Sequence, residues 1–166
     1  MIEPVELRIS NGRMAFGDVP EHVDLKLQAA VAARESPETC EALLWEAHHL
    51  GPRVLPVFYA LYKFYFNQKR LAEAERAALI GLDAAAHQLS VSSDWRTLTT
   101  DSAADWSAEG ATRFYLFTMK ALAFINLRRD KPDVAAQLLA KLAELDPADH
   151  VGYGVIALLA KGGEGE

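Results

Sequence analysis

A recurrence of small and apolar residues at fixed spacing is the feature that most restricts how this chain can fold. The matching positions are Leu27, Leu61 and Leu122; Cys40, Ala74 and Ala135; Leu44, Ala78 and Leu139; Ala47, Gly81 and Leu142; and Pro52, Ala86 and Pro147. In each group the second residue follows the first by 34 positions, and the third follows the second by 61, which is 34 plus 27. Such a period is typical of helical solenoids, in which a hairpin of two helices cannot bury its apolar face alone and stacks on the next hairpin.

The body of the chain is expected to be helical, because apolar residues recur at three- and four-residue spacing over 21–160. The extra 27 residues fall between the second and third pairs, where Val91 to Ser107 is polar and lacks helical periodicity. We therefore expect an insertion loop at about 90–107. Asp149 to Ala160 suits a capping helix, with Asp149 accepting bonds from free backbone amides. Residues 161–166 are expected to be a flexible tail, too rich in glycine to stay helical.

Strand-like alternation is confined to the start of the chain. Apolar and polar residues alternate on both sides of Asn11-Gly12, and this pattern predicts a short β-hairpin over Val5 to Phe16. The expected architecture is therefore an all-α domain over 19–160, built from three helix pairs and a C-terminal capping helix. A β-hairpin-like appendage at 1–18 precedes it.

Composition limits the classes of function. Hydrophobic residues make up 51% of the 166 residues, enough for a sizeable core. The net charge of -6 disfavours nucleic acid and anionic membranes as partners. The single cysteine, Cys40, excludes an intramolecular disulfide and fits a reducing compartment. The N-terminus does not have the pattern of a secretory signal and no window has the length and apolarity of a membrane span, so we expect a soluble cytoplasmic protein.

One segment carries a family resemblance. The run from Lys120 to Pro147, which closes with Leu-Asp-Pro, resembles a tetratricopeptide repeat, and Phe58 to Leu82 resembles the same pattern more loosely. Val23 to Pro52 matches it mainly by period. The resemblance implies a tetratricopeptide-like solenoid with a concave groove for a peptide or partner protein. Tyr59 to Phe66 and Arg113 to Phe117 are also similar to small repeat proteins of bacterial nitrogen-fixation gene neighbourhoods.

Candidate binding residues lie on the first helices of the second and third pairs. Six aromatic residues crowd the segment 58–66, which favours a buried core helix; alternatively, Tyr59 and Phe66 form an aromatic floor for a bound peptide. If the pairs align, two sets of residues four apart share one groove. These sets are Tyr59, Lys63 and Asn67, and Lys120, Phe124 and Arg128.

The charges of these sets predict what the groove binds. Two lysines and an arginine would attract an acidic segment or a C-terminal carboxylate, unless the lysines are simply solvated. Family members that hold C-terminal carboxylates use a similar lysine, asparagine and arginine clamp, which the residues here match a turn out of place. Lys26 and Lys141, by contrast, are expected on or near outer faces.

Two tryptophans and two adjacent histidines are further candidates for a functional role. Trp95 and Trp106 lie in the expected loop, where they either pin the loop onto the helices or contact a partner. His48 and His49 are adjacent on a helix and point about 100° apart, so both cannot face one metal ion without a third element. We expect one of them to cap the carbonyl groups of a helix that Gly51-Pro52 ends.

The sequence contains none of three common catalytic motifs: there is no nucleophile elbow, phosphate loop or metalloprotease helix. We expect neither a catalytic residue nor a cofactor nor a bound metal. The leading hypothesis is a protein-interaction scaffold or accessory chaperone, with oligomeric state undetermined. Two alternatives stay open: a type III-like secretion chaperone, and an enzyme or metal-handling protein with an unrecognised site.

Overall fold

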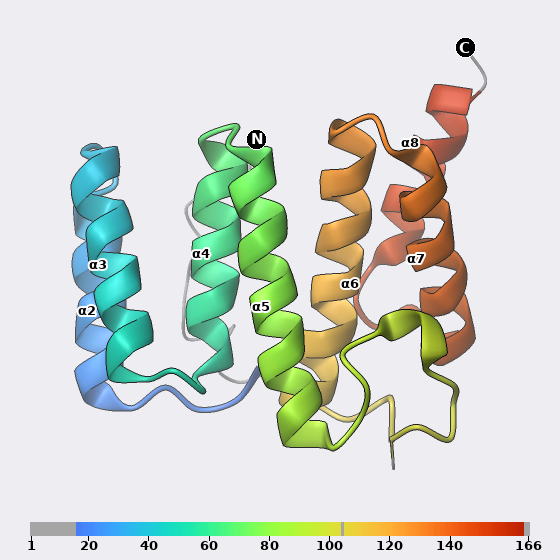
Figure 1. Cartoon of the computed structure of the whole chain (residues 1–166), viewed down its shortest axis with the longest axis horizontal. Helices are drawn as coiled ribbons and strands as arrows, with labels where there is room; N and C mark the ends of the chain where they lie inside the picture. The colour runs from blue at the N-terminus through green and yellow to red at the C-terminus, as the bar shows by residue number, and fades with distance from the viewer. Residues whose placement is uncertain (1–15, 104, 165–166) are drawn as a thin grey trace. The chain divides into compact units, whose positions relative to one another are not determined.

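The structure, a computed structural model, describes residues 16–103 and 105–164, and within them all regular secondary structure is helical (Figure 1). The chain divides into two compact units, Met1–Gly81 and Leu82–Glu166. The α-helices are α2 (Glu21–Ala32), α3 (Pro37–Leu50), α4 (Leu55–Asn67), α5 (Leu71–Leu89), α6 (Ala111–Arg128), α7 (Pro132–Leu145) and α8 (Tyr153–Glu164), and a short 3-10 helix, η2, covers Trp95–Thr97. The boundary between the units lies inside α5.

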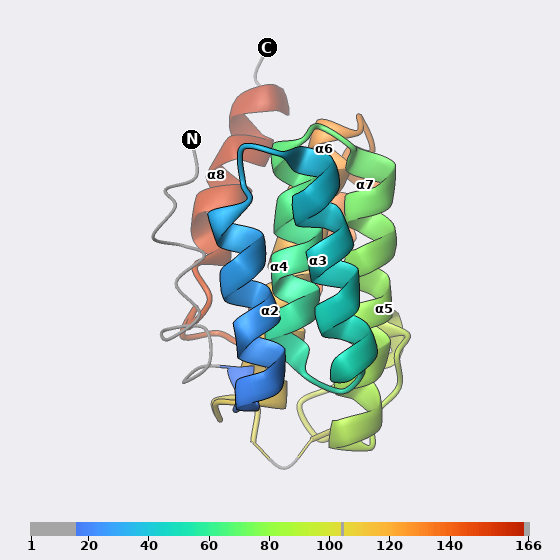
Figure 2. The ribbon, with the colours of Figure 1, turned by 90° about the vertical axis from the view of Figure 1, so that its left-hand side faces the viewer.

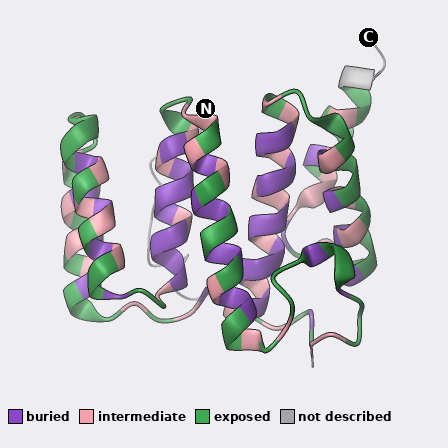
Figure 3. Cartoon of the chain, viewed as in Figure 1, coloured by how far each residue is buried: buried purple, intermediate pink, exposed green. Residues whose placement is uncertain are grey.

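The first unit begins with an antiparallel hairpin. Figure 2 shows α2 and α3 side by side, joined by a short turn, and α3 also contacts α4. Pro37 starts α3 at a position where the missing amide hydrogen costs nothing. Helix α4 is buried around most of its circumference, and its buried residues include Phe58, Leu61, Tyr62 and Tyr65. The side of α4 that faces the viewer in Figure 3 is mostly purple, the colour of buried residues.

The second unit repeats the hairpin and adds a loop and a last helix. Helices α6 and α7 pack against each other, and α8 contacts both of them. The loop between α5 and α6 contains η2, which contacts α7. The core of this unit includes Phe114, Leu122, Leu138 and Leu142, each at most 2% exposed.

The repeating positions of the sequence have equivalent places in the three hairpins. Leu27, Leu61 and Leu122 are buried, and so are Cys40, Ala74 and Ala135 on the second helices. The backbone amides of this second set donate to the carbonyl four residues earlier, at 2.9, 2.9 and 3.3 Å. The second helix of every pair therefore begins with the same bond.

The turns of the second and third hairpins are closed in the same way. Lys69 and Asp130 both have a φ of 61°, a left-handed conformation that ends a helix. In each turn the next amide donates to the carbonyl five residues earlier, at 2.9 and 2.8 Å. The first hairpin differs, because its turn holds no described residue of positive φ.

At the ends of the chain, one expected element lies outside the described residues and another has different bounds. The hairpin expected over Val5 to Phe16 lies outside the described residues, except Phe16, which is helical. The capping helix was expected over Asp149 to Ala160, but α8 begins at Tyr153 and continues to Glu164. Positive φ values at Asp149 and Gly152 break the backbone and delay the start of α8. The segment expected to be a non-helical tail is helical as far as Glu164, so that expectation was wrong there.

The expected cap itself is present. The carboxylate of Asp149 accepts hydrogen bonds from the amides of Tyr153 and Gly154, at 2.6 and 3.1 Å, and so satisfies two free donors at the start of α8. No helix in the described part of the chain combines the length and the apolar character needed to cross a membrane.

Candidate functional site

The structure brings two of the predicted binding residues together on α4. The Nζ atom of Lys63 donates to the Tyr59 hydroxyl at 2.9 Å and lies 5.3 Å from the centre of its ring. Phe16 and Tyr62 make edge contacts with the Tyr59 ring, at 5.8 and 5.7 Å between centroids. Lys63 is only 5% exposed, so its charge is held against an aromatic cluster.

The remaining α4 residues lie at the C-terminal end of the helix. Phe66 is half-buried, and Asn67, the last residue of α4, is exposed. Along α4, the predicted residues therefore follow one another as a phenol (Tyr59), a buried ammonium (Lys63) and a half-buried ring (Phe66). All four predicted residues of α4 belong to the first unit.

The predicted residues of α6 form a second set, in the other unit. Lys120, Phe124 and Arg128 follow one another at four-residue spacing, which places them on one face of the helix. The Nζ atom of Lys120 lies 4.2 Å from the centre of the Phe117 ring, a cation–π contact. Lys120 and Phe124 are half-buried, whereas Arg128 is exposed in the last turn.

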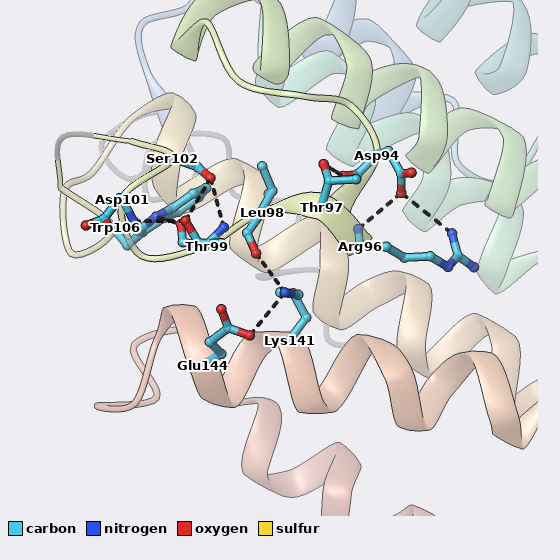
Figure 4. A network of polar contacts seen from close by, with 10 residues as sticks. All are labelled: Asp94, Arg96, Thr97, Leu98, Thr99, Asp101, Ser102, Trp106, Lys141 and Glu144. Atoms are coloured by element: carbon cyan, nitrogen blue, oxygen red, sulfur yellow. Dashed lines mark hydrogen bonds and ion pairs between the residues drawn. The ribbon is translucent and has the colours of Figure 1, made fainter.

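The two tryptophans of the loop are buried. Trp95 and Trp106 are each 6% exposed. The indole Nε1 of Trp106 donates to the carbonyl of Thr99 at 3.1 Å (Figure 4), and its ring contacts Tyr115, 6.0 Å away. The Tyr115 hydroxyl in turn donates to the carbonyl of Ser92 at 3.0 Å. Through Trp106 and the Ser92 carbonyl, Tyr115 thus attaches both ends of the loop to α6.

A lysine on α7 holds the middle of the loop. The Nζ atom of Lys141 donates to the carbonyl of Leu98 at 2.7 Å and pairs with Glu144 at 3.0 Å (Figure 4). Its side chain is 16% exposed, so the expectation that Lys141 lies on an outer face was wrong. The loop covers this face of α7, and the spacing of residues within α7 does not predict that a loop packs there.

The exposed rim of the loop is polar. Asp94 accepts a hydrogen bond from the amide of Arg96 at 3.1 Å and so caps η2. The guanidinium of Arg96 lies 4.3 Å from the centre of the Trp95 ring and donates to Gln137 at 3.3 Å. These contacts shield the buried indole from solvent.

Sequence reasoning missed a network that joins α3, α4 and the start of α5. The Tyr65 hydroxyl donates to Glu41 at 2.6 Å and accepts from the indole of Trp45 at 2.8 Å. Arg70 donates to both oxygens of Glu41, at 2.8 and 3.1 Å, and to both oxygens of Glu73, at 2.7 and 2.6 Å. Glu41 lies 24 and 29 residues from Tyr65 and Arg70, and no local pattern signals such a pairing.

The network shifts the ionisation of its members. Hydrogen bonds from Arg70, and then from Tyr65, hold the pKa of Glu41 below its ordinary value of 4.5. Burial, followed by the bond to Glu41, raises the pKa of Tyr65 to about 12. At neutral pH the phenol therefore stays protonated and donates to a carboxylate that stays ionised. The network is a structural clamp of the first unit.

Replacing Tyr65 with phenylalanine should lower the free energy of unfolding by about 1–2 kcal/mol, because Glu41 loses a donor and the Trp45 indole loses its acceptor. The pKa of Glu41 is depressed in the folded state, so its contribution is present above pH 4.5 and is lost as the pH falls through the lower folded value. Urea unfolding at pH 7 and at a series of lower pH values measures both effects. A difference between wild type and Tyr65→Phe that stays constant as the pH falls through the series below 4.5 would contradict the role given to Glu41.

The two histidines near the end of α3 do not both face solvent. His48 makes edge contacts with Trp45 and Phe58, at 5.5 and 5.1 Å, and its buried Nδ1 has no hydrogen-bond partner. Burial, and then the neighbouring His49, lowers the pKa of His48. Because the Nδ1 of His48 has no partner, this atom does not supply the expected cap. The amide of Gly51 closes α3 by donating to the carbonyl of Ala47.

Comparison with known proteins gives one informative match. No protein-family model and no solved structure matches the chain. The chain is 29% identical over 116 residues to a protein of Azotobacter chroococcum mcd 1 described as "Uncharacterized 19.8 kDa protein in nifW 5'region". The match covers 69% of this chain and 65% of that relative, so it spans slightly less than two thirds of the relative. The chain is thus distantly similar to a protein of a nitrogen-fixation gene region.

Proposed function

We propose that this protein is a tetratricopeptide-like scaffold or accessory chaperone that binds a peptide or a partner protein. The observation that carries the proposal is the repetition of one hairpin three times, with the same buried positions and the same bond at the start of each second helix. Repeats of this kind present the same face of successive first helices, and that is the surface such proteins use for binding.

The residues of α6 give the proposed surface its chemistry. Lys120 and Arg128 supply positive charge, and the half-buried Phe124 between them supplies apolar contact. An acidic segment or a free C-terminal carboxylate fits this face of α6, because charge steers the encounter and the Phe124 ring holds the bound chain. On α4, in the other unit, Tyr59 and Phe66 supply an aromatic surface of their own.

The similarity to a protein of a nitrogen-fixation gene region suggests where to search for the partner. We propose that the partner is encoded in such a gene neighbourhood and that this protein assists it without catalysing a reaction.

Charge reversal on α6 tests the proposal. The double variant Lys120→Glu with Arg128→Glu should capture at least about tenfold less partner from extracts of the source cell, because it turns attraction into repulsion. The matched control, Arg34→Glu with Lys131→Glu, has the same change in net charge at two exposed positions and should capture the partner normally. Capture by the wild type should also weaken as salt rises.

The experiment avoids Lys63, since a reversed charge beside the Tyr59 ring would disturb packing as well as binding. Partners are identified by mass spectrometry, and their affinities are then measured with purified proteins. Equal affinity for the wild type and the α6 double variant would refute the proposed surface.

A further inference from the structure

Phe16, the first described residue, is anchored on α4. It is 6% exposed, and its ring contacts the Tyr59 ring at 5.8 Å between centroids. Gly17 follows with a φ of 109°, a conformation that side-chain-bearing residues rarely adopt, so the turn from this anchor toward α2 requires glycine. Residues 1–15, which we call the N-terminal segment, therefore join the helical body of the first unit beside Tyr59.

The place of this anchor matters because of what surrounds Tyr59 on α4. Spacings of four and three residues put Tyr59, Lys63 and Phe66 on one side of the helix, which we call the α4 face. The two rings are half-buried, and Lys63 is 5% exposed with its Nζ donating to the Tyr59 hydroxyl at 2.9 Å. A carboxylate is the partner that best suits a buried ammonium, because a charge is costly to remove from water unless an opposite charge meets it. A ligand of the α4 face thus combines a carboxylate with apolar side chains.

The N-terminal segment has this combination in its sequence. Every second residue from 3 to 9 is acidic or aliphatic: Glu3, Val5, Leu7 and Ile9. Residues two apart share one side of an extended chain, so this side carries one carboxylate followed by three aliphatic groups. The charges of Glu6 and Arg8 fall on the other side.

The dimensions of the segment also fit. Side chains on one side of an extended chain repeat about every 6.6 Å, close to the roughly 5.4 Å between successive turns of a helix. Helix α4 has 13 residues and is therefore about 20 Å long. Ile9 lies seven residues before Phe16, a reach of up to about 23 Å. From the anchor at Phe16, residues 3–9 can therefore reach the whole α4 face.

We propose that residues 3–9 dock in extended form on the α4 face of their own molecule, with Glu3 paired to Lys63 and the aliphatic side chains on the rings of Tyr59 and Phe66. This inference rests on the proposed function and deepens it, because the segment is then an internal ligand of a partner-binding surface. A tethered ligand acts at an effective concentration on the order of millimolar. A partner that binds α4 has to displace the segment, and release of the segment regulates that binding.

Trypsin tests the docking, because its cleavage site after Arg8 lies inside the segment. In the full chain this bond should be cut at least about tenfold more slowly than in the segment as a free synthetic peptide. The variant Val5→Ser with Leu7→Ser loses aliphatic contacts and should be cut within about threefold of the rate of its own peptide. The matched control, Ile2→Ser with Glu6→Ser, changes the other side of the extended chain and should stay protected.

Two outcomes of this experiment overturn the proposal. One is cleavage of the wild-type chain as fast as that of the free peptide. The other is protection that disappears on dilution, which would mean that the segment docks on a second copy of the chain.

Charge removal tests the ion pair. Glu3→Gln and Lys63→Met should each speed cleavage after Arg8 about fivefold, because each leaves one charge without its partner. The two changes together should do little more than either alone, as expected for residues that act as a pair. The matched control, Lys131→Met, has the same change in net charge at an exposed position of the other unit and should be cut like the wild type.

Circular dichroism of each variant shows whether its helices are intact. Glu3 lies outside the described helices, so Glu3→Gln tests the pair even if Lys63→Met fails to fold. Cleavage of Glu3→Gln at the wild-type rate, or full additivity in the double variant, overturns the pairing.

Binding of the segment as a separate peptide tests the regulation. A fluorescein-labelled peptide of residues 1–15 should bind the Val5→Ser, Leu7→Ser chain at least about tenfold more tightly than the wild type, whose own segment competes. Equal affinity for the two chains, or binding to neither, overturns the proposal. These experiments use only the purified chain and its own peptide. Their failure is therefore distinguishable from failure of the proposed function, which is tested by partner capture with the α6 variants.

Discussion

Replacing Trp106 with alanine should lower the free energy of unfolding by about 3–5 kcal/mol, the usual cost of deleting a buried tryptophan side chain. The indole is 6% exposed, contacts the Tyr115 ring and donates to the Thr99 carbonyl. Urea unfolding followed by circular dichroism measures the loss. The conservative variant Trp106→Phe should lose less, because it keeps an aromatic ring and gives up only the hydrogen bond and part of the contact area.

The same variant should also release the loop. Limited proteolysis should cut Trp106→Ala within 91–107 faster than the wild type, because the loop has lost one of its anchors. Equal cutting rates and an unchanged midpoint of unfolding would mean that the loop is held without this indole, and would leave Lys141 and Trp95 as its anchors.

Replacing Ala135 with leucine should lower the free energy of unfolding by about 1–3 kcal/mol, since the added carbon atoms have to enter a filled contact. Ala135 is fully buried on α7, whereas the next residue, Ala136, is exposed. The variant Ala136→Leu is therefore the matched control and should stay within about 0.5 kcal/mol of the wild type. Thermal unfolding of the two variants side by side gives the comparison.

The repeat alignment extends this prediction to α5. Ala74 occupies the equivalent position on α5 and is also fully buried, so Ala74→Leu should cost a similar amount. An Ala135→Leu variant as stable as Ala136→Leu would remove Ala135 from the close contact between paired helices.

Much of the fold could be predicted because its signals are local. The positions of Leu27, Leu61 and Leu122 were predicted from spacing alone, and all three are buried. Helix periodicity and small residues record which side of a helix faces its neighbour, and this information is contained within 34 residues. The helical pairs were accordingly confirmed, and so was the cap by Asp149.

The chemistry of individual side chains was harder to predict. Lys63 and Lys141 have the same charge and similar helical settings, yet one lies against the Tyr59 ring and the other donates to the Leu98 carbonyl. The contact between Lys63 and Tyr59 is local, because the two residues are four apart on α4. The partner of Lys141 lies 43 residues away, in the loop. The sequence of α7 does not show which distant segment covers it, and burial of the aliphatic part of a lysine is compatible with many such covers.

The clamp of Glu41, Tyr65 and Arg70 was missed for a related reason. Each residue has an ordinary alternative role on a helix surface, and only the packing of α3 against α4 brings the three together. The burial of the tryptophans was one of two interpretations that the sequence left open, because a polar loop can either cover a core or extend into solvent.

The hydrogen bonds between the loop and α7 affect the order in which the second unit folds. Within the helical hairpins the contacts join residues close in sequence, such as Lys26 and Glu46, 20 residues apart. The bond from Lys141 to Leu98 spans 43 residues, and the bond from Arg96 to Gln137 spans 41. Longer closures carry a larger entropy cost and contribute only once the hairpin of α6 and α7 exists to receive them. We therefore expect hairpin formation to be the fast, local event in the second unit, and attachment of the tryptophan-bearing loop to be the late one.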